Sequence, residues 1–467
     1  MVCFRWLILF GFMFWVAGCR QHGAEVTEIK LNPHHHNALQ VQVDVLTDQN
    51  ASVYAEYWPD SSETGEKYRS IVSPEGKSHS VVLYNLLPHK AYSYRIVTIS
   101  NGKQQESQVY HFQSQDLPPW LQDQFKSVSS VPQLLPKEFT TGYMLMNKRE
   151  TPGLVYLVDT KGRIRWYHMV DGTGFKVSHF TADTTIISIL GTNDEPTSYG
   201  SEIMELNLAG DTLLHLKKGM GDFPQQVHHE VLKKNSNEII TLFVDKPNMD
   251  LTAVGASKKE TVNGDGIMIM DRKGKELWQW SVFDVMNPFD DHQLLQHKKD
   301  WMHANSLNFD KDSNLLISFY NNGQIWKIDA HTGKVLWKLG KGGTLSMPQG
   351  ADFSMAHSVH INPKGDLMFF DNGTDRHQSE VFAFKINDAA KSAQTTLHVA
   401  LPQDIYNDRM GSAYMINDTT VLCCSSKRHI AVLANTKGTL LWTLETAIPP
   451  YRVQFIPAGW LRQYIKD

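Results

Sequence analysis

The sequence has few cysteines, no excess of basic charge and no long hydrophobic run after its first residues. Its four cysteines are too few and too irregularly spaced for a disulfide scaffold. The net charge of −4 leaves no basic field for nucleic acid, so no nucleic-acid partner is expected. Hydrophobic residues make up 41% of the 467 residues and charged residues 20%, which excludes a disordered chain.

Glycine and aromatic residues, by contrast, are abundant. The chain contains 31 Gly, 12 Trp, 16 Tyr and 21 Phe, a combination typical of many short strands joined by tight turns. The composition therefore favours a large all-β protein.

The first nineteen residues are similar to a bacterial lipoprotein signal. Arg5 precedes an apolar run from Trp6 to Val16, which is shorter than the roughly 20 residues of a membrane span. The run ends at Ala17-Gly18-Cys19, which resembles a lipobox. We expect residues 1–18 to be a lipoprotein signal peptide and Cys19 to carry lipid. The protein would then be secreted across the inner membrane and anchored in the periplasm or at the outer membrane, and a plain signal peptide is the alternative.

The segment after this signal alternates between apolar and polar positions. Val41–Leu46 shows the period of two that is typical of a half-buried strand. Leu86-Leu87-Pro88, leading into Tyr92-Ser-Tyr94, resembles the late strands of a fibronectin type III-like sandwich. We predict a small immunoglobulin/fibronectin III-like β-sandwich over 19–115, followed by a Pro- and Ser-rich linker over 116–133.

From about residue 134 onward a short G-x-x-x-W pattern recurs, each time after a segment that ends in Asp or Asn. Four copies begin at Gly162, Gly274, Gly333 and Gly438. A fifth begins at Gly210 and has Leu214 in place of Trp, and a degraded copy covers Asn387 to Leu397. Six strand–turn–strand units of about 50 residues predict a six-bladed β-propeller over 134–467.

Histidines occupy similar places before successive strands. His229, His303 and His357 each precede a predicted inner strand by about ten positions, and His179 is placed similarly. Because inner strands of a propeller surround one axis, these imidazoles are expected to meet in a shared site. Imidazoles can act as nucleophile, general base, oxyanion ligand or zinc ligand. No carboxylate or cysteine accompanies them at a tight metal-binding spacing, so neither a metal nor a cofactor is expected.

Several motifs around these histidines resemble those of the bacterial aryl-sulfate sulfotransferases. Trp301-Met-His-Ala-Asn-Ser306 resembles the family's W-x-H-x-N-S, and His228-His229-Glu230 resembles its H-H-[DE]. Phe353-Ser-Met-Ala-His357 and Phe370-Asp-Asn-Gly373 resemble F-x-x-Q-H and F-D-N-G, and Trp337-Lys-Leu-Gly340 resembles W-x-L-G. The resemblance extends over roughly residues 130 to 460.

The resemblance implies transfer of a sulfuryl group from a phenolic sulfate ester to a phenol, without a nucleotide donor. His357 would be the nucleophile and form a sulfohistidine, with His303 and His229 as the other catalytic residues. Further substrate-binding residues would be Asn305, His228, His360, Arg376 and Tyr320. The implied partners are a small phenolic donor and acceptor and, through the anchor, a membrane. A homodimer is left open.

The chain departs from the family pattern at two arginines. Tyr320 occupies the arginine position of an S-x-R motif, and Ser379-Glu380 replaces an S-R pair. Arg376, Arg409 and Arg428 are candidate replacements, of which Arg376 lies closest to F-D-N-G. Two alternatives therefore stay open: a non-catalytic propeller that binds an anionic or aromatic ligand, and a metal-dependent lyase or hydrolase.

Overall fold

The computed structural model describes residues 23–61, 67–224 and 226–465, which form two compact units. The first unit contains Gln42–Leu83, Ala91–Phe112 and the segment ending at Asn32. The second contains the rest, including Pro33–Val41 and Tyr84–Lys90. The expected signal peptide and Cys19 lie outside the described residues.

The first unit is built around one long strand, β2 (Val41–Pro59), which pairs with four others. The seven strands form one hydrogen-bonded sheet with the order β1-β2-β5-β6, while β3 and β4 pair with β2 and β7 pairs with β5. Its other strands are β1 (Val26–Pro33), β3 (Tyr68–Arg69), β4 (Gly76–Leu83), β5 (Ala91–Ser100), β6 (Lys103–Glu106) and β7 (Tyr110–Gln113).

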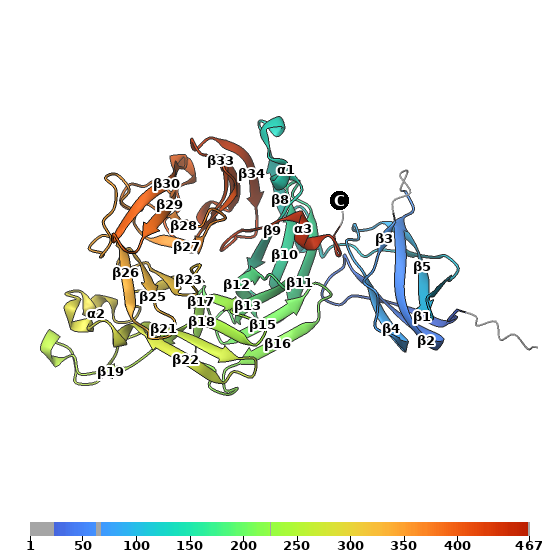
Figure 1. The fold of residues 1–467 in the computed structure, drawn as a ribbon, viewed down its shortest axis with the longest axis horizontal. Helices are drawn as coiled ribbons and strands as arrows, with labels where there is room; N and C mark the ends of the chain where they lie inside the picture. The colour runs from blue at the N-terminus through green and yellow to red at the C-terminus, as the bar shows by residue number, and fades with distance from the viewer. Residues whose placement is uncertain (1–22, 62–66, 225, 466–467) are drawn as a thin grey trace, which may run out of the picture. The chain divides into compact units, whose positions relative to one another are not determined.

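The second unit is a six-bladed β-propeller, as the repeat predicted, with six antiparallel sheets arranged around an axis (Figure 1). Blades one and two consist of β35 (Gln454–Ile456), β9 (Tyr143–Lys148), β10 (Gly153–Asp159) and β11 (Ile164–Val170), and of β12 (Gly174–Phe180), β13 (Thr185–Gly191), β15 (Glu202–Asn207) and β16 (Thr212–Lys217). Blade three consists of β14 (Tyr199–Gly200), β17 (Val227–Lys233), β18 (Glu238–Asp245), β21 (Gly264–Asp271) and β22 (Glu276–Ser281).

Blades four to six follow the same antiparallel order. They consist of β23 (Ala304–Phe309), β24 (Leu315–Phe319), β25 (Gln324–Ile328) and β26 (Val335–Gly340); of β27 (Ala356–Ile361), β28 (Leu367–Asp371), β29 (Glu380–Asn387) and β30 (Ser392–Ala400); and of β31 (Ser412–Asn417), β32 (Thr420–Ser425), β33 (Ile430–Asn435), β34 (Leu440–Thr446) and β8 (Phe125–Val128). β35, β12, β17, β23, β27 and β31 contact one another in turn around the axis, so they are the innermost strands of their blades apart from the two-residue β14 in blade three.

The predicted G-x-x-x-W units are the outer hairpins of the blades. In blade one, Asp159 Oδ1 accepts hydrogen bonds from the backbone N–H groups of Lys161 and Arg163, at 3.0 and 2.9 Å. Gly162 has φ of 79°, a left-handed conformation that glycine adopts without a Cβ clash. The same Asp/Asn and glycine combination closes the hairpins at Asp271 and Asn435.

The tryptophans of these hairpins bind the hairpin of the next blade. The indole N–H of Trp166 donates to Leu208 O at 2.9 Å, that of Trp337 to Asp388 Oδ1 at 2.7 Å, and that of Trp442 to Thr160 O at 3.0 Å. In blade three the donor is Trp280, to Gly333 O at 3.0 Å, and not Trp278 of the repeated motif. The two residues share one face of β22, and Trp280 is the more deeply buried of them.

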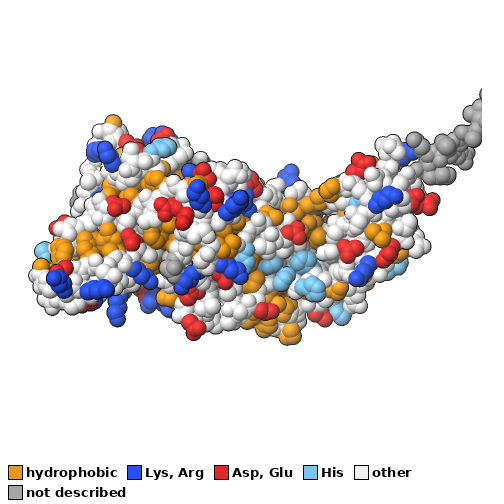
Figure 2. All heavy atoms as spheres, turned by 90° about the horizontal axis from the view of Figure 1, so that it is seen from below, with side chains coloured by type: hydrophobic (Ala, Val, Ile, Leu, Met, Phe, Trp, Pro, Cys, Tyr) orange, Lys and Arg blue, Asp and Glu red, His pale blue; other side chains and the backbone are white. Residues whose placement is uncertain are grey.

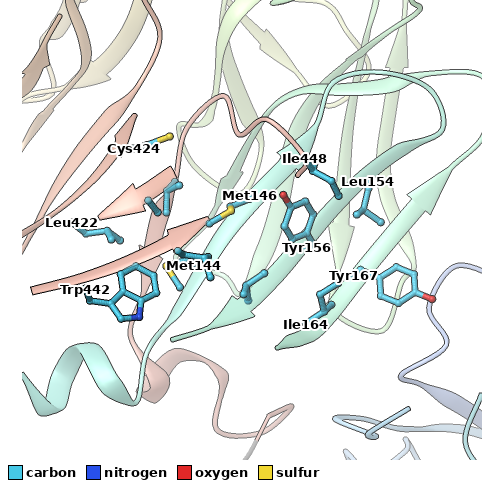
Figure 3. Packing of buried hydrophobic residues seen from close by; sticks show 14 of the residues in the cluster. Met144, Met146, Leu154, Tyr156, Ile164, Tyr167, Leu422, Cys424, Trp442 and Ile448 are labelled. Carbon is cyan, nitrogen blue, oxygen red and sulfur yellow. The ribbon is translucent and has the colours of Figure 1, made fainter. Parts of the chain in front are cut away.

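Both ends of the propeller chain contribute to ring closure. β35 pairs with β9 as the innermost strand of blade one, and β8 pairs with β34 at the outer edge of blade six. Residues 125–128 of the predicted linker therefore belong to the sixth sheet, because this strand supplies hydrogen bonds to an otherwise open edge. Figure 3 shows the apolar cluster at this junction, in which Met144 and Tyr156 of blade one pack near Leu422 and Trp442 of blade six.

Helix is scarce in the described part of the chain, where α1 (Lys137–Thr140), α2 (Leu294–His297) and α3 (Ala458–Leu461) have four residues each. None of the described helices has the length and hydrophobicity needed to span a membrane. On the face in Figure 2, basic and acidic side chains are interspersed rather than gathered into a single basic field.

Candidate functional site at the propeller axis

Three predicted histidines meet at the start of successive inner strands. His229 lies on β17, His303 directly precedes β23, and His357 lies on β27. All three line one cavity of about 570 Å³, and Tyr320 lines it with them. The sequence placed these residues in three different repeats, and the propeller brings them together.

An unusual backbone conformation accompanies these histidines. His229 and His303 have φ of 55° and 54°, and Ser358, next to His357, has φ of 56°. Each inner strand also has an irregular register at this point, between His228 and Val231, Ala304 and Ser306, and His357 and His360. A left-handed non-glycine residue costs about 1 kcal/mol, and such costs concentrate at functional sites. The bulges turn the side chains away from the regular pleat.

The His357 ring is held in one tautomer by Asn372. The Asn372 Nδ2 group donates to Asn407 O at 2.7 Å and to Met410 O at 2.9 Å, which orients its Oδ1 as an acceptor. His357 Nδ1 lies 2.6 Å from this oxygen and must therefore carry the proton. The other nitrogen, Nε2, accepts from the Met410 N–H at 3.2 Å. Burial lowers the pKa of His357 to about 3, so the ring is neutral with its lone pair on Nε2.

His303 has the opposite protonation preference. Its Nδ1 lies 2.6 Å from Asp300 Oδ2. Burial acts against the charged ring, but the hydrogen bond and the negative charge of Asp300 raise the pKa of His303 above its usual value. The site thus contains a neutral imidazole at His357 and an imidazole that favours protonation at His303.

The His229 ring forms a hydrogen bond with the ring of the preceding residue, His228. Its Nδ1 lies 2.9 Å from His228 Nδ1, and burial keeps the pKa of both rings below the usual range, that of His228 at about 4. His228 Nε2 in turn lies 3.5 Å from Asp265. His228 is buried and does not line the axial cavity, but contacts His229, which does; its predicted substrate-binding role stays a prediction.

Aromatic rings form a continuous wall between the histidines. The ring centroids of His229 and His303 are 4.8 Å apart, those of His303 and Tyr320 5.4 Å, and those of Tyr320 and His357 5.6 Å. The Tyr320 hydroxyl donates to Asp408 O at 3.1 Å. The wall allows edge and face contacts with a planar ligand, close to two imidazoles with different protonation preferences.

Three other predicted substrate-binding residues lie outside the axial cavity. Asn305 is fully buried, and its amide joins Ala356 O at 2.9 Å and the Ser318 hydroxyl at 2.6 Å. The Arg376 guanidinium is bound to three carboxylates, which neutralise it: Asp371, Asp375 and Glu380. His360 lies farther along β27, beyond the bulge. The substrate-binding role expected of these three residues stays a prediction. Their positions follow from tertiary contacts, because the sequence does not reveal which charges are already paired.

His360 lines a second cavity, of about 290 Å³, together with His179, Glu230 and Arg452. The Arg452 guanidinium donates to Glu230 at 2.6 Å and to Asn305 O at 2.6 Å. His179 is hydrogen-bonded to the same Glu230 carboxylate, so it does not join the ring of His229, His303 and His357. His179 therefore lines the second cavity and not the axial cavity, where its spacing in the sequence had placed it.

Several lining residues were missed by the sequence reasoning. Arg149, Asp300, Asp408, Met410 and Lys427 all border the axial cavity, and Asn372 orients His357. Asn372 stood within the F-D-N-G motif and Asp300 three residues before His303, so their sequence neighbourhood was a usable signal. Arg149 follows β9 in a loop with no recognisable motif. Across the described ranges, no three His, Cys, Asp or Glu side chains are arranged to hold a metal ion.

The fold and site define a class: a six-bladed propeller with a histidine-lined cavity on its axis. Comparison with models of protein families identifies the family within this class. The model described as Arylsulfotransferase (ASST) matches residues 128–443, and the chain belongs to this family. Membership supports aryl sulfotransferase activity in general terms.

Other comparisons give more distant similarity. No curated protein matches the sequence. A protein of unknown function from Bacteroides caccae is 12% identical, with a TM-score of 0.43 and coverage of 68% of this chain and 98% of its own. A streptogramin B lyase is 10% identical, with a TM-score of 0.36 and coverage of 69% and 98%. An inactive variant of virginiamycin B lyase from Staphylococcus aureus is 10% identical, with a TM-score of 0.33 and coverage of 69% and 99%.

Proposed function

We propose that this protein transfers a sulfuryl group from a phenolic sulfate ester to a phenol through a sulfohistidine at His357, without a nucleotide donor. One observation supports the proposal most strongly. Asn372 fixes the proton of His357 on Nδ1, so Nε2 keeps a lone pair beside the cavity at neutral pH. A neutral, oriented imidazole is the form that can act as a nucleophile.

In the first half-reaction the Nε2 lone pair of His357 attacks the sulfur of the aryl sulfate. The N–S bond forms as the bond from sulfur to the phenolic oxygen breaks, and the electron pair of that bond leaves with the oxygen. Protonated His303 gives its Nε2 proton to this oxygen, because its Nδ1 is occupied by Asp300. The products are a free phenol, neutral His303 and sulfohistidine.

The second half-reaction reverses these steps with the acceptor. Neutral His303 takes the proton of the acceptor hydroxyl as its oxygen attacks sulfur. The S–N bond breaks, its electron pair returns to His357 Nε2, and a new aryl sulfate leaves. The Met410 N–H donates to Nε2 in the resting protein, so this hydrogen bond breaks as Nε2 attacks sulfur, and the N–H can then donate to a sulfuryl oxygen.

The other cavity residues suit a planar, anionic substrate. His229 faces His303 at 4.8 Å between centroids and offers a hydrogen-bond donor to the sulfuryl group. Tyr320 lies between His303 and His357, where its ring can contact the aromatic ring of donor or acceptor. Transfer of this kind depends chiefly on positioning and electrostatics, which such a preorganised cavity supplies.

The test uses the purified full chain with 4-nitrophenyl sulfate as donor and phenol as acceptor. We expect release of 4-nitrophenol that depends on phenol, formation of phenyl sulfate, and a sulfate adduct on the His357 peptide after rapid quenching. His357→Ala is expected to lose all three while remaining folded. Phenol-independent release, or an adduct on another residue, would contradict the proposal.

The alternative is a non-catalytic module that binds anionic or aromatic ligands. It predicts saturable binding of 4-nitrophenyl sulfate with no product and no adduct in the same experiment. The family arginine missing at Tyr320 is the observation that keeps this alternative open.

We also propose that the chain is lipidated at Cys19 and exposed in the periplasm or at the outer membrane, with an immunoglobulin/fibronectin III-like N-terminal domain. The sequence Ala17-Gly18-Cys19 supports the anchor, and the seven-stranded sheet of the first unit supports the domain. Cys19→Ala is expected to move the protein from the detergent phase to the aqueous phase after Triton X-114 partition. Unchanged partition would contradict the anchor.

A further inference from the structure

Arg149 is a buried arginine of the axial cavity whose charge has no carboxylate partner among the described residues. It directly follows β9, is 7% exposed and lines the cavity. Its Nε has no hydrogen-bond partner there, and its Nη1 lies 3.1 Å from the Met410 Sδ. A thioether is a weak acceptor, so the desolvation cost of this buried guanidinium is only partly compensated by its contacts with Met410 and the Tyr451 ring.

The other cations close to the axis differ from Arg149. Arg376 is bound by three carboxylates and lies outside the cavity. Arg452 is paired with Glu230 and lines the second cavity. Arg409 pairs with the neighbouring Asp408, and its side chain is 60% exposed, while Lys427 is exposed at the cavity. Arg149 therefore combines burial, a free polar atom and access to the cavity.

Two residues connect Arg149 with the proposed reacting groups. Met410 contacts the Arg149 guanidinium through its sulfur and donates its backbone N–H to His357 Nε2 at 3.2 Å. The Tyr451 ring lies 5.7 Å from the Arg149 guanidinium carbon and 6.4 Å from the His229 ring. One residue, Met410, therefore separates the guanidinium from the His357 ring, and one residue, Tyr451, separates it from the His229 ring.

The backbone of Arg149 is fixed by its neighbour in blade two. A Cβ atom at Gly174, the first residue of β12, would overlap the carbonyl group of Arg149, so the glycine allows close contact between the two blades. This contact positions the start of the arginine side chain on rigid structure.

We infer that Arg149 binds the sulfuryl oxygens of the donor and of the sulfohistidine, and so supplies the cation missing at Tyr320. The inference rests on the proposed function for the identity of the anion. A guanidinium matches a tetrahedral oxyanion with two parallel N–H groups, which a lysine ammonium cannot reproduce. The cation would come from the loop after β9 in blade one, and not from the turn after β24 in blade four, where Tyr320 lies.

The test measures binding separately from turnover. Phenyl sulfate and phenol are titrated by calorimetry into the full chain carrying His357→Ala, alone and combined with Arg149→Met or Arg149→Lys. We expect phenyl sulfate affinity to fall at least tenfold with Arg149→Met and by a smaller factor with Arg149→Lys, while phenol affinity stays within twofold. Arg163→Gln is the matched control, because Arg163 lies on the outer hairpin of the same blade and pairs with Asp159.

Phenyl sulfate affinity within twofold of the parent in folded Arg149→Lys and Arg149→Met would overturn the inference. An equal loss of phenol affinity would also overturn it, because it would show that Arg149 only shapes the cavity. If Arg149→Met does not fold, Arg149→Lys, which keeps the charge and most of the side-chain volume, decides the question alone. Normal phenyl sulfate binding without transfer by the unsubstituted chain would reject the proposed function and leave the assignment of Arg149 standing.

Discussion

At the scale of single residues, the site separates its imidazoles by protonation. Asn372 Oδ1 accepts a hydrogen bond from the Nδ1–H of His357, and burial keeps this ring neutral, whereas the charge of Asp300 favours a protonated His303. The two rings have the same intrinsic pKa of about 6.5, so the difference comes wholly from their neighbours. An acid and a nucleophile made of the same side chain can then coexist within one cavity.

The first prediction concerns the pH dependence of kcat/KM. His357 has a pKa of about 3 and is neutral over the working range, so no acidic limb from its protonation is expected above about pH 5. His303 must be protonated, and its raised pKa places an alkaline limb above 6.5. Asp300→Asn removes the negative charge that raises this pKa and is expected to move the limb to lower pH.

Initial rates from pH 5 to 10 with 4-nitrophenyl sulfate and phenol measure the limb. Asp408→Asn is the control, because this cavity carboxylate pairs with Arg409 and forms no hydrogen bond to His303. An alkaline limb that does not move in Asp300→Asn, or that moves equally in Asp408→Asn, would contradict the role of Asp300.

The second prediction concerns the tautomer of His357. Asn372→Leu removes the acceptor of the Nδ1 proton, so the ring can place its proton on Nε2 and lose the nucleophilic lone pair. We expect kcat to fall by roughly 10²- to 10⁴-fold, as for other displaced catalytic tautomers, with a small change in KM for the donor. Steady-state rates and circular dichroism measure the two effects. A KM increase with unchanged kcat would instead indicate a role in binding.

At the scale of the structural element, the outer hairpins and the inner strands have different functions. The hairpins follow one local rule, an Asp or Asn acceptor followed by a left-handed glycine, and they bind the next blade through an indole N–H. The inner strands break regularity, with bulges and left-handed residues at His229 and His303. The repeated outer hairpins thus stabilise the contacts between blades, and the irregular positions of the inner strands form the site.

The third prediction separates the two tryptophans of β22. Trp280 donates to Gly333 O in the next blade, whereas Trp278 is half-buried and keeps the repeated motif. Both replacements remove the same indole atoms, but Trp280 is the more deeply buried residue, and its replacement by Phe leaves the Gly333 carbonyl without its donor. We expect Trp280→Phe to reduce the free energy of unfolding by about 1 kcal/mol more than Trp278→Phe. Urea unfolding followed by circular dichroism measures the difference. Equal losses would contradict the inter-blade bond.

At the scale of the whole molecule, a ring needs both chain ends to close it. β35 comes from the C-terminal part and completes the first blade, while β8 comes from before the first blade and extends the last. Contacts between residues more than 300 positions apart, such as Trp442 with Ser127, hold the junction. Propeller stability is therefore a property of the closed ring rather than of one blade.

The fourth prediction tests this closure. Ending the chain at Val453 removes β35 and the buried side chains of Ile456, Leu461 and Ile465. Three such side chains contribute roughly 5–9 kcal/mol, comparable with the whole stability of many proteins. We expect the truncated protein to lack a cooperative thermal transition and to be degraded rapidly by trypsin. A full chain with Trp460→Ala, which changes an exposed residue of the same segment, is the control. An unchanged melting temperature would contradict the role of β35.

The sequence by itself determined the propeller, its six units and the three histidines. These depend on local patterns. A hairpin needs glycine and Asp or Asn at fixed offsets, and each of the three histidines stands at a similar distance before an apolar strand segment. Only the tertiary structure decided which polar groups face the cavity. Asn305 and Arg376 are used in buried contacts, while Arg149 enters the site from a loop without a motif. The physical reason is that burial and charge pairing depend on residues from other blades, which no local pattern contains.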